Sequence, residues 1–239
     1  MSDTVLIAYE GKLSRDQLAL VSTPQATATH KPIPHVEVIN GLIETLGFRH
    51  IAVVNDEYAV SKDGMKMFGV MELDQGMHGA RFALGVRNSH DKSFRLAVTV
   101  GYRVFVCENL AFSGDFSPVL AKHSKNFSLA NALSIGVDEM QRNFRPMVES
   151  VDRWRQMQLS DVTARLVIYR AFIEGELEVS RYLARPVHDL YFNPQHEDFR
   201  PRTLWSLSNA FTSAFKELDP IPQYKATGKL AGFLEAVAG

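Results

Sequence analysis

The chain has 239 residues and a formal net charge of −1 at pH 7, with 46% hydrophobic and 22% charged residues. This balance is typical of a globular protein with a buried core, and it excludes an intrinsically disordered or strongly basic chain. Any affinity for nucleic acid must therefore come from a local patch of positive charge.

Several chemistries lack their usual sequence signals. Cys107 is the only cysteine, which excludes a disulfide framework and a thiolate metal cluster and favours a reducing cytoplasm. No apolar run approaches the roughly 20 residues that span a membrane. The eight histidines lack metal-ligand spacing, and glycine-rich phosphate loops are absent. We expect a cytoplasmic protein that uses no membrane, metal or cofactor.

The first elements are an arm and a helix. Residues 1–34 are predicted to be extended, because 23–29 is polar and rich in β-branched residues and 31–34 contains two prolines. From His35 to Leu46 the apolar residues recur on one helical stripe, and Gly47 supplies the usual stop.

Strands follow the helix. The sequence predicts strands at 48–55, 57–61 and 65–73, separated by turns at Asn55-Asp56 and at 62–64. Such short connections predict a mostly antiparallel sheet.

Residues 80–110 predict a long β-hairpin. In both arms large apolar residues alternate with small and basic ones, so each strand has one apolar face and a second face of Ala, Gly, Thr and Arg. Simple pairing would set Arg87 opposite Arg95 and Ala83 opposite Thr99. Like charges placed opposite each other destabilise a hairpin, so this second face suggests an anionic partner.

The second half of the chain is helical. After an irregular stretch at 110–120 with a turn at 113–115, a long helix is predicted from Ser128 with a kink at Pro146. Further helices are expected at 160–174, 178–190 and 203–217. The fold class is therefore α+β: an N-terminal helix, a mostly antiparallel sheet with a long hairpin, and a helical C-terminal half. We expect three regions: an arm at 1–34, a sheet domain at 35–125, and a helical region at 126–239 packed on it.

Basic residues on the hairpin are the strongest functional signal. Segment 81–103 carries five positive side chains against Asp91 alone, and arginine suits phosphate because its planar fork binds two oxygens. The alternative is a solvated face whose arginines pair with carboxylates elsewhere. If the C-terminal helices cover this face, it becomes part of the core. The candidate nucleic-acid-binding residues are Arg81, Arg87, Lys92, Arg95, Arg103, Lys122 and Lys125.

Catalysis has weaker support. His90-Asp91 could form a general base with an orienting carboxylate, but adjacent residues in a turn rarely have that geometry and no nucleophile accompanies them. A hydrolase or nuclease is the least favoured interpretation.

Two strings resemble a known family. FALGVRNSHDKSFRLAVTVGYRVFVCENLAFSG, beginning at Phe82, closely resembles the signature of bacterial phage- and plasmid-like proteins called domain of unknown function 932. TLWSLSNAFTSAFKEL, beginning at Thr203, resembles the C-terminal helix of that family. The resemblance covers about residues 35–217. It implies an origin in a mobile element and brings no established activity.

A second resemblance concerns the order of elements. The helix HVEVINGLIETLGF at 35–48, the antiparallel strands and the long helix from 128 are similar in order to Rad-type single-strand annealing proteins. Those proteins form rings or filaments and hold single-stranded DNA in a basic groove without ATP. This resemblance implies a homo-oligomer that binds single-stranded DNA or RNA and anneals it. The alternative is a phage or plasmid interaction protein, such as a host-defence inhibitor, whose basic patch docks on an acidic protein.

Overall fold

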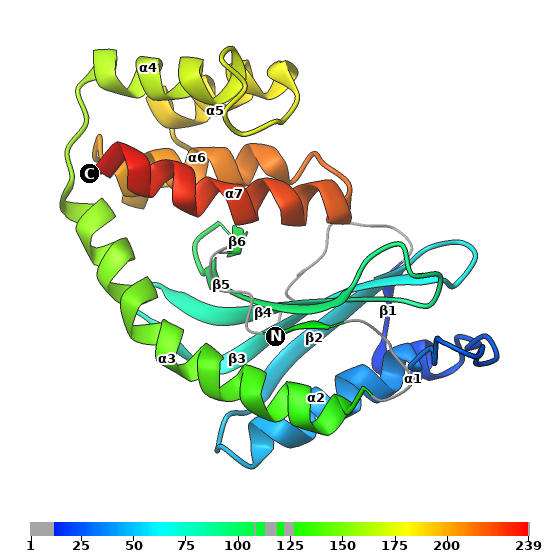
Figure 1. Cartoon of the computed structure of the whole chain (residues 1–239). Coiled ribbons are helices and arrows are strands. Elements are labelled where there is room, and N and C mark those ends of the chain that lie inside the picture. The colour runs from blue at the N-terminus through cyan, green and yellow to red at the C-terminus, as the bar shows by residue number, and fades with distance from the viewer. Residues whose placement is uncertain (1–11, 108, 113–118, 122–126, 239) are drawn as a thin grey trace.

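An antiparallel sheet lies between two helical layers in the computed structural model, which describes residues 12–107, 109–112, 119–121 and 127–238 (Figure 1). The strand order is β1-β2-β3-β4-β5-β6, and β7 also pairs with β5, at residues that β6 does not reach. The strands are β1 (Lys12–Leu13), β2 (Val53–Val60), β3 (Lys66–Met77), β4 (Ala80–Ser89), β5 (Leu96–Val104), β6 (Leu110–Phe112) and β7 (Val119–Ala121). The α-helices are α1 (Arg15–Ala19), α2 (His35–Gly47), α3 (Leu129–Gln156), α4 (Asp161–Phe172), α5 (Ala184–Phe192), α6 (Leu204–Phe215) and α7 (Pro220–Ala238).

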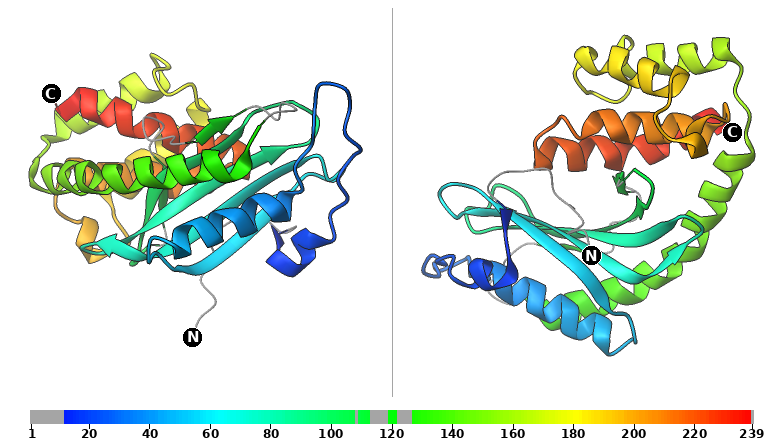
Figure 2. Two further views of the ribbon diagram at one scale, coloured as in Figure 1. Left: turned by 60° about the horizontal axis from the view of Figure 1, so that its bottom comes forward. Right: turned by 180° about the vertical axis from the view of Figure 1, so that it is seen from behind.

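The first face of the sheet packs on α2 and α3. Helix α2 turns Val38, Ile39, Leu42 and Leu46 fully inward. The sequence predicted a stripe of Val36, Ile39, Ile43 and Leu46, and Val36 and Ile43 are only half-buried at its margin. Helix α3 begins at the predicted Ser128, whose side chain caps the Asn131 amide. It continues through Pro146 to Gln156 and runs beside α2 before it reaches α4 (Figure 2).

Aromatic packing joins this face to α3. Phe144 of α3 stacks on Phe82 of β4, with ring centroids 3.9 Å apart and planes 5° apart. Phe82, Leu84 and Val86 of β4 are all buried. Burying these alternate side chains is the main stabilising term for the hairpin, since removal of apolar area from water contributes roughly 25 cal/mol per Å².

The second face is covered by the C-terminal helices. Helices α6 and α7 pack together above the sheet, and α4 and α5 form a further layer beyond them (Figure 1). A separate apolar cluster fills the space between this face and α7, and Tyr224 packs against it. Its members are Ala59, Phe68, Val70, Ala83, Leu110 and Phe112.

The α+β class, the helix at 35–46 and the helices at 160–174 and 203–217 are confirmed. The helix predicted at 178–190 is instead a 3₁₀ turn at Arg181–Leu183 followed by α5, and the predicted arm contains β1 and the short helix α1. Helix α7 was not predicted individually, because Pro220 and Pro222 resemble a breaker but stand in its first turn, where missing amide donors cost nothing.

The strand prediction at 48–61 is wrong in detail. The two predicted strands are one strand, β2, and Asn55-Asp56 lies inside it rather than in a turn. A bulge between Val53 and Asn55 absorbs the irregularity. Asp56 is held in the strand by Arg15, whose Nη2 donates to its carboxylate at 2.9 Å. A polar pair that resembles a turn signal is therefore satisfied by the N-terminal segment.

The register predicted for the hairpin is wrong by two residues. Arg87 lies opposite Ala97 rather than Arg95, and Ala83 lies opposite Gly101 rather than Thr99. The loop is longer than a simple turn because the Ser89 hydroxyl donates to the Phe94 carbonyl at 2.9 Å and closes it. A shift of two residues leaves every side chain on its predicted face, so the division into two faces is preserved. The predicted turn at 113–115 lies outside the described residues.

Candidate functional site

Two of the predicted arginines lie at one end of the second face and share a buried carboxylate. Arg103 Nη1 donates to Glu72 Oε2 at 2.8 Å, and Arg81 Nη1 donates to Glu72 Oε1 at 3.1 Å. The Glu72 side chain is 2% exposed and that of Arg103 is 6% exposed. Arg103 is therefore a structural ion-pair partner inside the fold, and it cannot line an open groove as the sequence predicted.

The middle of the second face is also closed. The Tyr224 ring of α7 lies 5.3 Å from the ring centroids of both Phe68 and Phe112. A Cβ built on Gly85 would come within 2.9 Å of both Phe112 and Tyr224 ring atoms. The small residues of this face thus admit aromatic side chains of the same chain, not a sugar-phosphate backbone.

A basic pocket opens beside the Tyr224 ring, where the aromatic side chains no longer cover the second face. It has a volume of about 480 Å³ and lies between the hairpin, the segment 177–180 and the first turns of α7. That volume falls within the range of sites for small ligands. We use the name basic pocket for this cavity, whose polar and charged lining residues are Arg87, Thr99, Glu178, Ser180, Tyr224, Lys225 and Lys229.

Arg87 is the central cation of the basic pocket. Its guanidinium lies 5.6 Å from the ring centroids of both Phe94 and Tyr224. Its Nε is buried and has no hydrogen-bond partner among the described residues. A buried donor without a partner costs free energy, so Arg87 is poised for an anionic acceptor.

Other groups set the electrostatics of the basic pocket. Burial raises the pKa of Tyr224, whose hydroxyl lies in a short hydrogen bond with Thr99, while that bond and the Arg87 charge act in the opposite direction. The phenol therefore stays neutral beside Arg87. Lys229 pairs with Glu178, whereas Lys225 is exposed. The pocket consequently has an excess of positive charge.

The remaining predicted residues divide into two groups. Lys92 and Arg95 are exposed on the hairpin loop, on either side of Phe94, whose ring centroid lies 5.6 Å from the Arg87 guanidinium. Lys122 and Lys125 lie outside the described residues. The prediction missed Tyr224, Lys225 and Lys229, because no local pattern in α7 indicates that this helix covers the hairpin.

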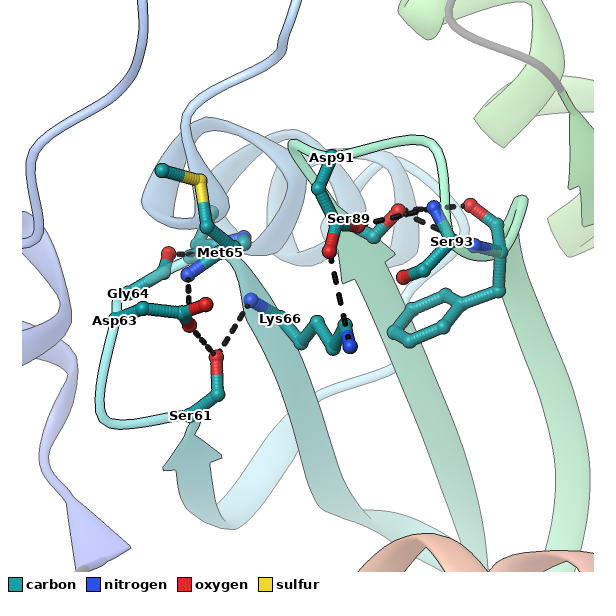
Figure 3. A network of polar contacts seen from close by, with 10 residues as sticks. Ser61, Asp63, Gly64, Met65, Lys66, Ser89, Asp91 and Ser93 are labelled. Atoms are coloured by element: carbon teal, nitrogen blue, oxygen red, sulfur yellow. Dashed lines mark hydrogen bonds and ion pairs between the residues drawn. The ribbon is translucent and has the colours of Figure 1, made fainter.

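The hairpin loop does not place His90 and Asp91 as a catalytic pair. The Asp91 carboxylate accepts from the Ser93 amide at 2.9 Å and forms an ion pair with Lys66 at 3.7 Å (Figure 3). The His90 ring is buried and donates through Nε2 to the Ile33 carbonyl at 2.9 Å. The carboxylate thus organises the turn while the imidazole ties the arm to the hairpin.

Three histidines form a buried cluster at this junction. The rings of His35 and His90 stack with centroids 3.9 Å apart, and His30 Nε2 donates to the His90 carbonyl at 2.9 Å. His35 Nε2 donates to the Gly64 carbonyl, which leaves its Nδ1 to accept from Asn88 Nδ2 at 2.9 Å. This arrangement requires a neutral His35. No group of three metal-ligating side chains is found among the described residues.

Acid is expected to destabilise the fold through this cluster. Burial lowers the pKa of His90 below its ordinary value of 6.5 and the His30 charge acts in the same direction, while the Ile33 carbonyl and Asp91 oppose them. The unfolded chain then binds a proton that the folded state does not. The contribution of His90 to the free energy of unfolding is therefore largest above about pH 6.5, and it decreases as the pH drops through the lowered pKa.

Urea unfolding at neutral and mildly acidic pH measures this loss. His90→Gln keeps a donor for the Ile33 carbonyl and should reduce the pH dependence relative to the wild type. An identical pH dependence in His90→Gln and the wild type would contradict the assignment.

The described residues thus define an α+β protein whose central sheet is covered on both faces and has a basic pocket at one end. A family model described as "Domain of unknown function (DUF932)" matches residues 26–228, most of the chain. The chain belongs to this family. Comparison with curated proteins and with solved structures gave no match. No helix in the described part of the chain is long and apolar enough to cross a membrane.

Proposed function

We propose that this protein binds single-stranded nucleic acid at the basic pocket and the adjoining hairpin loop, and that it promotes annealing of complementary strands without ATP. The observation that carries the proposal is Arg87, a pocket-lining guanidinium with a buried Nε that lacks a partner among the described residues. Lys225, Lys92 and Arg95 extend the positive charge from the pocket onto the surface. In this site Arg87 binds one phosphate of the strand, and Lys225, Lys92 and Arg95 bind the neighbouring phosphates.

The shape of the site favours a single strand over a duplex. A concave pocket of about 480 Å³ can admit one phosphate with part of a nucleotide, whereas a rigid duplex presents its phosphates on a wide convex surface. The rings of Phe94 and Tyr224 beside Arg87 supply a surface on which a base or sugar can pack.

The order of elements supports the annealing part of the proposal. Helix α2, the antiparallel strands β2 to β5 and the long helix α3 follow one another in the chain, and it is in this order that the sequence resembles the Rad-type annealing proteins. In this proposal the protein belongs to a phage or plasmid and acts in recombination. The binding site differs from the basic second face of the hairpin that the sequence predicted, because Arg81 and Arg103 are paired with Glu72.

Replacing Arg87 by Gln together with Arg95 by Ala is expected to lower the affinity for a single-stranded oligonucleotide at least tenfold. Each lost phosphate contact removes a charge-assisted hydrogen bond worth roughly 1.5–3 kcal/mol and reduces the salt slope by about 0.7. Fluorescence anisotropy over a salt series, with a matched duplex, measures both effects.

Arg145→Ala is the matched control, because this arginine is exposed on α3 and pairs only locally with Glu149 at 2.8 Å. Its affinity should equal that of the wild type, and all variants should keep the wild-type melting temperature. If the double variant binds as tightly as the control, the basic pocket is not the site. Preference for duplex, or retention of an acidic protein after nuclease treatment in place of oligonucleotide binding, would also overturn the proposal.

A further inference from the structure

Helix α4 has an apolar side that nothing in the described structure covers. Val162, Leu166, Tyr169 and Ile173 at its C-cap are 75%, 54%, 50% and 45% exposed. The opposite side of the same helix is buried against the rest of the protein through Ala164, Val167, Ile168, Ala171 and Phe172. Thr163, Arg165 and Arg170 separate the two apolar sides. An exposed apolar patch rimmed by polar residues marks an interaction surface, so the exposed side should be covered in an assembly.

The spacing of the exposed side chains indicates what covers them. Positions 162, 166, 169 and 173 follow steps of four, three and four residues, which is the seam spacing of a helix that packs along another helix. These steps align the four side chains in one straight stripe along α4. A stripe of this shape fits a helix that carries a matching apolar seam.

We infer that α4 is a self-association surface and that its partner is the α4 of a second copy of this chain, packed antiparallel about a two-fold axis. The steps read the same in both directions, so the axis brings Val162 of one copy next to Ile173 of the other and Leu166 next to Tyr169. A self-complementary seam of this kind is what a two-fold interface requires.

The charges beside the seam select the antiparallel orientation. With Leu166 and Ile173 at a positions, Arg165 occupies a g position and Arg170 an e position of the heptad. A parallel pair would place Arg165 of one copy beside Arg170 of the other. An antiparallel pair instead places Arg170 near Thr163 and Arg165 near Phe172, so no like charges face each other.

Both arginines already have partners that hold them beside the seam. Arg170 Nε donates to Glu176 at 2.7 Å, and the Arg165 guanidinium lies 4.7 Å from the centroid of the Phe192 ring. The seam therefore stays apolar.

The size of the surface sets the expected strength. Helix α4 has 12 residues and a length of about 18 Å, and its seam alone is smaller than the roughly 800 Å² per partner of a standard interface. We expect a reversible dimer with a dissociation constant on the order of micromolar. Sedimentation velocity of the full chain over a wide concentration range should show a shift from monomer to dimer.

Leu166→Lys is expected to keep the protein monomeric at every concentration tested, with an unchanged melting temperature because the side chain is exposed. Ile135→Lys is the matched control: Ile135 is 61% exposed on α3, and its replacement should leave dimerisation intact. A wild-type chain that stays monomeric throughout, or a Leu166→Lys variant that still dimerises like the control, would overturn the inference.

Thr163 tests the orientation. The Thr163 amide donates to Ser160 Oγ at 3.0 Å, which is one half of a capping box. Glu or Gln at position 163 would supply the other half by accepting from the Ser160 amide. Only Thr163→Glu adds a carboxylate opposite Arg170 of the second copy, and it should tighten the dimer severalfold relative to Thr163→Gln. Equal association of the two variants would exclude the antiparallel arrangement.

Discussion

Replacing Glu72 by Gln is expected to lower the free energy of unfolding by about 3–5 kcal/mol, the usual cost of breaking a buried ion pair from one side. The carboxylate sits between Arg103 at 2.8 Å and Arg81 at 3.1 Å. The Gln amide is neutral, so the buried Arg103 charge would lose the carboxylate that compensates it. Urea unfolding measures the loss.

Two further variants separate this effect from the loss of a hydrogen bond. Glu149→Gln removes an exposed carboxylate from an i,i+4 pair on α3 and should leave the stability close to that of the wild type, because water screens exposed pairs. Glu72→Met combined with Arg103→Met removes both buried charges and should regain much of the stability. A single Glu72→Gln variant as stable as the Glu149→Gln control would show that Arg103 is solvated and accessible.

Replacing Gly101 by Ala is expected to destabilise the protein by about 1–3 kcal/mol through overpacking. Gly101 pairs with Phe112 across β5 and β6, and an added Cβ would lie 2.1 Å from the Ala111 carbonyl oxygen and 2.8 Å from the Phe112 ring. The carbonyl belongs to the backbone of β6, so it cannot rotate away as a flexible side chain could. The edge strand or the Phe112 ring must move.

Gly47→Ala is the matched control, since the same substitution at the end of α2 meets no atom within 4 Å. It should leave stability unchanged or raise it by up to about 1 kcal/mol, because alanine has the higher helix propensity. Comparing the midpoints of chemical unfolding distinguishes the two sites. Equal stability of both variants would mean that β6 does not pack tightly on β5.

The covering of the second face explains why these positions are sensitive. Glu72, Gly85 and Gly101 all lie beneath groups contributed by other strands or by α7. The sequence shows a strand face of small and basic residues, and that pattern is equally compatible with an open groove and with a tightly covered surface. Only the position of α7 distinguishes the two.

Local pattern was sufficient for most elements of the fold. The stripe from Val36 to Leu46 predicted α2, the cap at Ser128 predicted the start of α3, and the alternation from 82 to 106 predicted the faces of the hairpin. These features depend on residues close in sequence, whose 3.6- and 2-residue periods are set by backbone geometry alone. The predicted strand boundary was wrong at Asp56, because a hydrogen bond from the distant Arg15 holds this residue inside β2.

Residue patterns alone predict the α+β class, the two faces of the hairpin and the local excess of positive charge. Which of those charges remain available depends on how the strands and helices pack. Arg81 and Arg103 pair with Glu72 because the pairing of β3, β4 and β5 brings the three side chains together, whereas Arg87 lies beyond the Tyr224 cover and opens into the basic pocket. The physical reason is that the energy of a charged side chain depends on its burial and its partners, and both are set by chain segments far away in the sequence.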